Sequence, residues 1–377
     1  MPDHRDRREE LDRRMDALGV DLVFLSPSAD LEYLTGFKRR VLTFGNIEYA
    51  HSWVTGCFFA RGREPAFVLP RMVMAFDLPE GLSGDITIVN ERDDGAAIFE
   101  RIAKSYAPVG TLAIGARAWS DTTLKLLPIF GGGKLISADA LLNPMRRVKS
   151  KEELEAMTRA CRLVDQVMGD VSPHVLGGVT ELELARDIDF AMRAKGSVAP
   201  SFDTGVWGMG QNSQRDATIR LSSGPVEPGL GISFDFGSVA DGYCSDFGRT
   251  VQVGDPSKDF SRVYETVMEA QAAGIRAARP GVPASSVHAA TREVIVEAGF
   301  GEWFRHRTGH CIGLDVHEHP FISEEDDTPL EAGMTFTIEP SIFRPGYYGA
   351  RVEDVVVCEE GGGRKLNEYP TTMVVNE

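Results

Sequence analysis

Residues that can carry chemistry gather in the C-terminal two fifths of the sequence. Four of the eight histidines fall in HRTGHCIGLDVHEHP (306–320): His306, His310, His317 and His319. Asp235 lies inside the apolar run GISFDFG, and Glu339 lies inside MTFTIEP. A carboxylate is rarely buried unless it is paired or bound to a cation, because removing its charge from water is costly. These positions therefore indicate a cation site or a set of buried ion pairs.

An internal repeat doubles this pattern. The segment 178–196 aligns with 281–299, and 227–237 aligns with 331–341, which sets Asp235 opposite Glu339. A looser match of 244–253 with 351–360 sets Asp246 near Glu353. Each half then reads as a helix, a strand that ends in a carboxylate, and a strand that begins with another. Repeats this far apart exceed a solenoid period, so we expect two halves facing each other across a pseudo-two-fold axis.

Four carboxylates placed in this way would repel one another, and a pair of divalent cations would remove that cost. The alternative is that each acid lies at the surface or pairs with an arginine such as Arg249 or Arg351. Oxygen ligands with one imidazole suit Mn²⁺, Fe²⁺ or Co²⁺, whereas structural zinc sites are built from Cys and His ligands. Cys311 follows His310 directly, and we expect it to be a bystander in an extended segment.

The elements that must position these residues divide the chain into two parts. The first reads as α/β: we expect a helix over 8–18, buried strands over 19–26 and 111–116, and a hairpin over 56–70. Ser150 and Glu153 have the spacing of a capping box and open an amphipathic helix. We therefore predict one domain over 1–146 and a second, α+β domain over 147–377.

Composition narrows the function classes. The chain has 377 residues and a net charge of −16, which disfavours nucleic acid as a partner. Its five cysteines are scattered and form no CxxC pair, which suits reduced thiols and a cytoplasmic location. The charged start MPDHRDRREELDRRM lacks the apolar core of a signal peptide, so none is predicted. No membrane span is predicted either, because no apolar run approaches the length of about 20 residues that crossing a membrane requires.

These motifs resemble those of peptidase family M24, which contains prolidase (Xaa-Pro dipeptidase), Xaa-Pro aminopeptidase and methionine aminopeptidase. The similarity rests on GISFDFG (231–237), GYCSDFGRT (242–250), HRTGHCIGLDVHEHP (306–320), Glu339-Pro340 and RVED (351–354). It implies a pita-bread catalytic domain with a pseudo-two-fold internal repeat. SPSADLEYLTGF (26–37) resembles the creatinase-type N-terminal domain, which methionine aminopeptidases usually lack.

The resemblance also implies roles for particular residues. Two divalent metal ions would be held by five ligands, with Mn²⁺ the expected ion and Co²⁺, Fe²⁺ or Zn²⁺ the alternatives; the ligands are Asp235, Asp246, His310, Glu339 and Glu353. Asp246 and Glu353 would bridge the ions, and Glu339 would also shuttle the proton of a metal-bridging hydroxide. His306 and His317 would act on the substrate, with His317 stabilising the oxyanion. His319 has no matching role.

One departure from the family concerns substrate recognition. Most such peptidases carry a histidine in the loop before the first ligand strand, and here 205–229 contains none. Asn212 resembles the family's loop asparagine, which places Gln214, Arg215 or Asp216 near the missing histidine. We therefore expect Arg215 and Asp216, together with Arg351, to contact the substrate. Arg220 is a further candidate, and Trp207 is expected either to form one wall or to pack in the core.

The leading hypothesis is a dinuclear metal-dependent hydrolase of Xaa-Pro dipeptides or short peptides with proline second. The alternative is a non-peptide hydrolase or lyase on the same fold, similar to ectoine hydrolase, creatinase or dimethylsulfoniopropionate lyase. A third class, a binding protein without activity, is disfavoured because the whole ligand set is present. The resemblance also implies a homodimer, to which the apolar segment 48–59 could contribute an interface.

Overall fold

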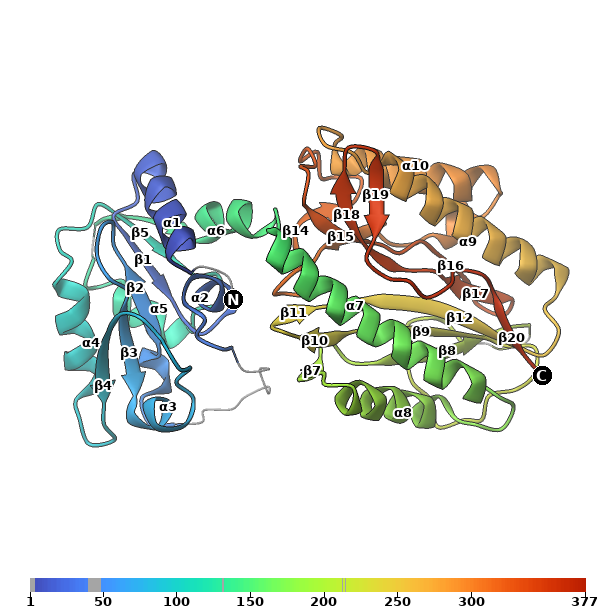
Figure 1. Cartoon of the computed structure of the whole chain (residues 1–377), viewed down its shortest axis with the longest axis horizontal. Coiled ribbons are helices and arrows are strands. Elements are labelled where there is room, and N and C mark those ends of the chain that lie inside the picture. The colour runs from blue at the N-terminus through green and yellow to red at the C-terminus, as the bar shows by residue number, and fades with distance from the viewer. Residues whose placement is uncertain (1–3, 40–48, 131, 212, 214) are drawn as a thin grey trace. The chain divides into compact units, whose positions relative to one another are not determined.

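A computed structural model describes residues 4–39, 49–130, 132–211, 213 and 215–377. The chain forms two compact units, 1–146 and 147–377, coloured blue to teal and green to red in Figure 1. Within the described part of the chain, no helix combines the length and the apolar character that crossing a membrane requires.

The first unit is a mixed six-stranded sheet with helices packed on it. Its strands run in the order β4-β3-β2-β1-β5-β6, with β1–β2 and β2–β3 antiparallel and the other neighbours parallel. The predicted hairpin over 56–70 is confirmed as β2 and β3, and the predicted helix over 8–18 is part of α1. Phe99 of α4 and Leu126 of α5 pack with Phe24 and Phe58 of the sheet, which gives this unit its own core.

The elements of the first unit have the following bounds. They are α1 (His4–Leu18), β1 (Leu22–Leu25), α2 (Ala29–Thr35), η1 (Ser52–Val54), β2 (Gly56–Phe59), β3 (Ala66–Pro70), α3 (Arg71–Phe76), β4 (Asp85–Val89), α4 (Gly95–Lys104), β5 (Thr111–Ile114), α5 (Ser120–Leu126), β6 (Lys134–Ser137) and α6 (Asp139–Arg146).

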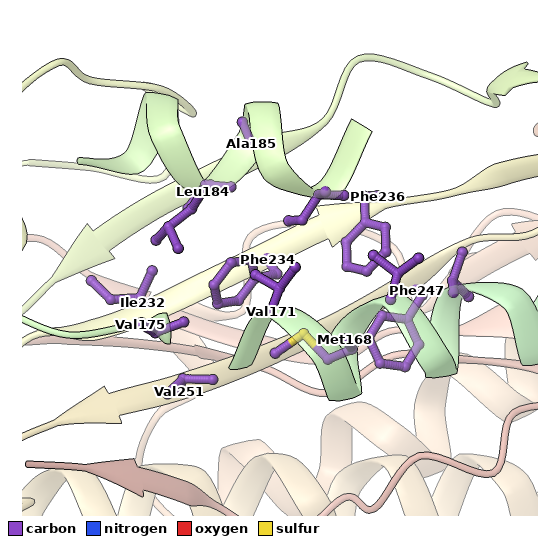
Figure 2. Packing of buried hydrophobic residues seen from close by; sticks show 14 of the residues in the cluster. Met168, Val171, Val175, Leu184, Ala185, Ile232, Phe234, Phe236, Phe247 and Val251 are labelled. Carbon is purple, nitrogen blue, oxygen red and sulfur yellow. The ribbon is translucent and has the colours of Figure 1, made fainter. Parts of the chain in front are cut away.

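The second unit begins with a sheet covered by two helices. The sheet has the order β20-β12-β9-β8, built from β8 (Gly205–Met209), β9 (Gly231–Phe236), β12 (Phe247–Val253) and β20 (Val374–Asn376). The predicted capping box is confirmed: Ser150 Oγ accepts the N–H of Glu153, whose side chain accepts the N–H of Ser150, and α7 (Lys151–Val171) follows. Figure 2 shows Met168 and Val171 of α7 and Leu184 of α8 (Glu181–Ala194) packed with the apolar side chains of β9, such as Phe234.

A second sheet repeats this order of elements. Its strands run β14-β13-β15-β18-β19, with bounds β13 (Gly309–Cys311), β14 (Glu318–Ile322), β15 (Thr335–Ile338), β18 (Asp354–Glu359) and β19 (Gly362–Lys365). Helices α9 (Lys258–Ala277) and α10 (Ala284–Glu297) pack on it (Figure 1). The antiparallel pair β15–β18 therefore corresponds to β9–β12 in the first half, as the sequence repeat predicts.

The remaining elements connect these layers. A hairpin of β16 (Ser341–Arg344) and β17 (Tyr348–Arg351) follows Glu339. The other short elements are η2 (Ser172–His174), β7 (Ala199–Pro200), β10 (Ser238–Ala240), β11 (Tyr243–Cys244) and η3 (Gly301–Trp303). An isolated bridge between Gly248 and Glu353 joins the two halves at the ends of their strands.

Candidate metal centre

The four carboxylates and His310 converge in the second unit. Asp235 lies on β9 and His310 on β13. Asp246 and Glu353 directly precede β12 and β18, and Glu339 directly follows β15. One carboxylate oxygen from each of Asp235, Asp246 and Glu353 lies within 4.8 Å of the others. His310 Nε2 lies 3.4 Å from Asp246 Oδ2 and 3.5 Å from Glu339 Oε1. The five predicted ligands thus form one buried cluster.

Strand register explains why residues so far apart in sequence meet. Asp235 on β9 pairs with Gly248 on β12, and Gly248 also bridges to Glu353. The N–H of Glu353 donates to the carbonyl of Gly248 over 2.9 Å. A Cβ at position 248 would lie 2.7 Å from Glu353 Oε2. Glycine at position 248 therefore leaves room for the Glu353 carboxylate and the Arg351 side chain where the two halves meet.

The chemistry of this cluster fits divalent cations. Asp246 Oδ1 and Glu353 Oε2 are buried, and neither has a hydrogen-bond partner among the described residues. His310 Nδ1 lies 3.1 Å from the carbonyl of Cys311, which can accept its N–H, so Nε2, which faces Asp246 and Glu339, is the nitrogen that would bind a cation. Oxygen ligands with one imidazole are a set that Mn²⁺, Fe²⁺, Co²⁺ and Zn²⁺ accept.

Burial and mutual repulsion oppose the charge of this cluster. Desolvation, with Asp235 and Glu339 nearby, raises the pKa of Asp246 to about 6. Desolvation and the charges of Asp246 and Glu339 raise the pKa of Glu353 well above its usual value. Burial also acts against the Glu339 carboxylate, but the Arg351 guanidinium and His310 lower the pKa of Glu339 overall. Further positive charge would favour all the ionised forms.

Arg351 supplies the nearest positive charge. Its Nη1 donates to Asp235 Oδ2 over 2.5 Å, and its guanidinium lies 3.5 Å from Glu339 Oε2 and 3.6 Å from Glu353 Oε2. The alternative that arginines pair with these acids therefore holds for Arg351. It does not hold for Arg249, whose side chain pairs with Asp354.

The cluster forms the floor of a cavity of about 1040 Å³. This volume is close to the upper end of the range for small-molecule sites. His306 and His317 also line the cavity, so the structure brings together all the residues predicted to be catalytic. The other lining residues include Phe202, Arg220, Arg305, Arg307, Phe321 and Phe343.

The two cavity histidines are held differently. His306 Nδ1 lies 2.6 Å from the carbonyl of Arg307 and Nε2 contacts Ser341 Oγ, so the ring is fixed at both nitrogens. The His317 ring lies 4.2 Å from the His310 ring, centroid to centroid. Desolvation and the charge of Arg351 lower the pKa of His306 to about 4, which keeps the ring neutral. Desolvation, with His310 and Arg307 nearby, lowers the pKa of His317 to about 4 as well.

His319 and Cys311 lie outside this arrangement. The His319 ring packs on Phe321, 4.5 Å between centroids, and does not line the cavity. Cys311 packs in the apolar core with Ile322 and Phe336, so it is the bystander that its position predicts. Burial raises the pKa of the Cys311 thiol to about 12.

The loop residues predicted to contact the substrate lie in different surroundings. Arg215 pairs with the buried Glu181 and lines another cavity, so its placement gives no support to a role at the metal cluster. Asp216 pairs with Arg305, which does line the cluster's cavity. Trp207 is buried against Phe343 in the core. Asn212 and Gln214 lie outside the described residues.

Two cavity arginines were not expected from the sequence. Arg305 is paired with Asp216, whereas Arg307 lies over the Phe321 ring, 4.6 Å from guanidinium carbon to centroid. Among the described residues, no ion pair or hydrogen bond engages the Arg307 guanidinium, and its Nε is buried. The one available signal was the position of Arg307 directly after His306.

Arg220 was expected in the substrate loop and does reach the cavity. Its Nη1 lies 2.8 Å from Asp235 Oδ2, and its guanidinium stands over the Trp207 ring. Asp235 therefore receives a second guanidinium besides that of Arg351.

Both units of the chain are similar to known proteins. Residues 155–360 match the model of Metallopeptidase family M24, and residues 7–148 match that of the Creatinase/Prolidase N-terminal domain. The chain resembles the Xaa-Pro dipeptidase of Pyrococcus furiosus, with 36% identity over 230 residues (61% of this chain and 66% of the relative).

Two solved structures extend the similarity to nearly the whole chain. The recombinant prolidase from Thermococcus sibiricus has a TM-score of 0.90 and 30% identity, with 100% of each chain covered. Dipeptidase PepE from Mycobacterium ulcerans has a TM-score of 0.85 and 33% identity, covering 99% of this chain and 97% of that one. The expected creatinase-type domain followed by a pita-bread catalytic domain is confirmed.

Proposed function

Because this chain belongs to metallopeptidase family M24, we propose that it is a metal-dependent dipeptidase that hydrolyses Xaa-Pro dipeptides. The observation that carries this proposal is the buried cluster of four carboxylates and one imidazole on the floor of a cavity lined by two further histidines. Asp235, Asp246, His310, Glu339 and Glu353 would hold two divalent cations. When bound, such a pair supplies an activated water nucleophile and polarises the scissile carbonyl.

The protein's own side chains would divide the remaining work. Glu339 keeps its carboxylate ionised beside Arg351, so it can take a proton from the attacking water and pass it to the leaving nitrogen. His317 faces the cavity beside His310, where a ring N–H can donate to the developing oxyanion. His306, held by Ser341 and the carbonyl of Arg307, would orient the substrate. Arg351, which was predicted to contact the substrate, lines the cavity and holds the Asp235 carboxylate through its hydrogen bond.

Arg307 favours a dipeptide over a longer peptide. Its guanidinium faces the cavity, lies against Phe321, and has no carboxylate partner among the described residues. A planar fork of donors matches a carboxylate, and the free carboxylate of a dipeptide lies one residue from the scissile bond. A longer peptide would place an uncharged amide there. The printed names of the relatives, Xaa-Pro dipeptidase and prolidase, support the same substrate class.

A non-peptide substrate on the same fold is the second candidate function. It is favoured by the loop 205–229, which has no histidine and instead sends Arg220 to within 2.8 Å of Asp235. That guanidinium would face a small charged molecule as readily as a peptide. The proposed manganese preference, homodimer and cytoplasmic location are independent of this choice.

The deciding experiment is hydrolysis of an Xaa-Pro dipeptide panel by metal-stripped protein, with Mn²⁺, Co²⁺, Zn²⁺ or no metal added back. Cleavage that requires added metal supports the proposal. No cleavage by protein shown by elemental analysis to hold two metal ions would refute it and favour a non-peptide substrate. Sedimentation equilibrium at micromolar concentration would test the homodimer.

A further inference from the structure

A buried ion pair lies beneath the loop that carries His317. Lys149 follows the start of the second unit, and its side chain is 1% exposed. Its Nζ donates to Glu318 Oε2 over 3.0 Å, and Glu318 is 7% exposed at its side chain. The two residues are 169 positions apart in sequence. Glu318 is the residue directly after His317.

This ion pair contacts the loop 312–317 through the Glu318 carboxylate. The N–H of Asp315 donates to Glu318 Oε1 over 3.2 Å, so one carboxylate joins the loop backbone to Lys149. A Cβ at position 313 would lie 2.8 Å from Glu318 Oε1 and 2.9 Å from Lys149 Cε. The loop therefore rests directly on the pair, and Gly313 is the residue type that lets it do so.

Other contacts fix the same loop relative to the metal cluster. The N–H of Cys244 donates to the carbonyl of Gly313 over 2.8 Å, two residues before Asp246. The N–H of Lys149 donates to the carbonyl of Gly333 over 3.0 Å, which anchors the lysine backbone. Residues 312–317 belong to no helix or strand, and Glu318, the first residue of β14, pairs with Cys311 of β13. The position of His317 is therefore set by this strand pairing on one side and by the contacts of Glu318 and Gly313 on the other.

Stability alone does not explain such a pair. Removing two charges from water costs as much as their attraction returns, and two apolar side chains of similar volume would hold the site at least as well. A salt bridge differs from an apolar contact in its direction and distance, because the ammonium must meet the carboxylate oxygen. Here that geometry is imposed on the residue adjacent to a cavity histidine.

We propose that Lys149, through Glu318, is a positioning residue for His317. This inference rests on the proposed function in one respect, the catalytic role of His317. Lys149 itself touches neither the cavity nor the cluster; it sets where the imidazole lies relative to His310 and the substrate carbonyl. Replacing residues that orient metal ligands changes activity by about 10- to 100-fold, and we expect the same order for a residue that orients His317.

The test uses the double variant Lys149→Met/Glu318→Met, which removes both charges of the pair together. Its kcat/KM on an Xaa-Pro dipeptide should fall about 10- to 100-fold. In a His317→Ala background the same double change should alter kcat/KM by less than about threefold, because the residue being positioned is gone. Arg147→Met is the matched control: it breaks the pair of Arg147 with Glu331 in the same segment and should leave kcat/KM unchanged.

A second readout does not depend on turnover. In protein labelled with ¹³C and ¹⁵N at histidine, the ring signals of His317 are identified by their loss in His317→Ala. The double variant should shift or broaden those signals and leave those of His306 in place. Unmoved His317 signals in the folded double variant, or an equal kinetic loss in both backgrounds, would overturn the inference. If the wild-type protein cleaves no dipeptide but the double variant still shifts the His317 signals, the proposed function is refuted and the positioning of His317 by Lys149 and Glu318 is supported.

Discussion

Replacing Arg307 with methionine should remove the preference of this protein for a free substrate carboxylate. Methionine keeps a flexible apolar chain against Phe321 but has no charge and no N–H donor. Because no ion pair or hydrogen bond among the described residues engages the Arg307 guanidinium, the substrate displaces no internal partner when it binds. The whole effect should therefore appear in substrate recognition and little in stability.

The expected size follows from the interaction that is lost. Hydrogen bonds to charged groups contribute about 1.5–3 kcal/mol. At about 1.4 kcal/mol per factor of ten, this corresponds to a loss of about 10- to 150-fold in kcat/KM. The partial exposure of Arg307 to solvent places the expectation toward the lower end of that range.

The assay compares Ala-Pro with Ala-Pro amide, which differ only in the terminal carboxylate. Wild-type protein should prefer the acid; Arg307→Met should lose about 10- to 150-fold on the acid and little on the amide. Arg305→Met is the matched control, because Arg305 is paired with Asp216, and it should keep the wild-type ratio of acid to amide. An equal loss on both substrates, or no loss on the acid, would refute the reasoning.

Three further predictions concern the metal cluster and its neighbours. Chelating the metal should lower the melting temperature by about 8–16 °C in calorimetry. A ligand at about 1,000 times its Kd stabilises the folded state by about 4 kcal/mol, and each kcal/mol shifts the melting temperature of a domain of this size by about 2–4 °C. An unchanged melting temperature would contradict a bound metal. Glu339→Gln should reduce kcat about 10²- to 10⁴-fold with metal content retained by elemental analysis, and a loss below tenfold would exclude the proton shuttle. Arg215→Met should destabilise the protein by about 3 kcal/mol in urea, because Glu181 is 2% exposed and would lose its countercharge, keeping the N–H of Gly208 as a donor. The kcat/KM of this variant should stay within about twofold; a tenfold loss would instead support Arg215 as a substrate contact.

Local features of the sequence were sufficient to predict the elements that carry the site. Ser150 and Glu153 cap α7 as their spacing predicts, because a capping box involves only neighbouring residues. The apolar runs around Asp235 and Glu339 form buried strands, since period and burial are encoded in the run itself. The internal repeat sets Asp235 opposite Glu339 and Asp246 near Glu353, a correspondence that depends on the sequence alone.

The residue types of the candidate metal centre, four carboxylates and a histidine in or beside repeated strands, are evident from the amino-acid sequence. The charged side chains that pair with them are set by tertiary packing. The sequence favoured Arg215 as a substrate contact and gave no reason to choose Arg307, but the loop turns Arg215 toward Glu181 while Arg307 lines the cavity. Lys149 meets Glu318 across 169 positions, a contact that no local pattern contains. The physical reason is that secondary structure depends on neighbours in the chain, whereas side-chain partners depend on how sheets and loops from distant segments pack.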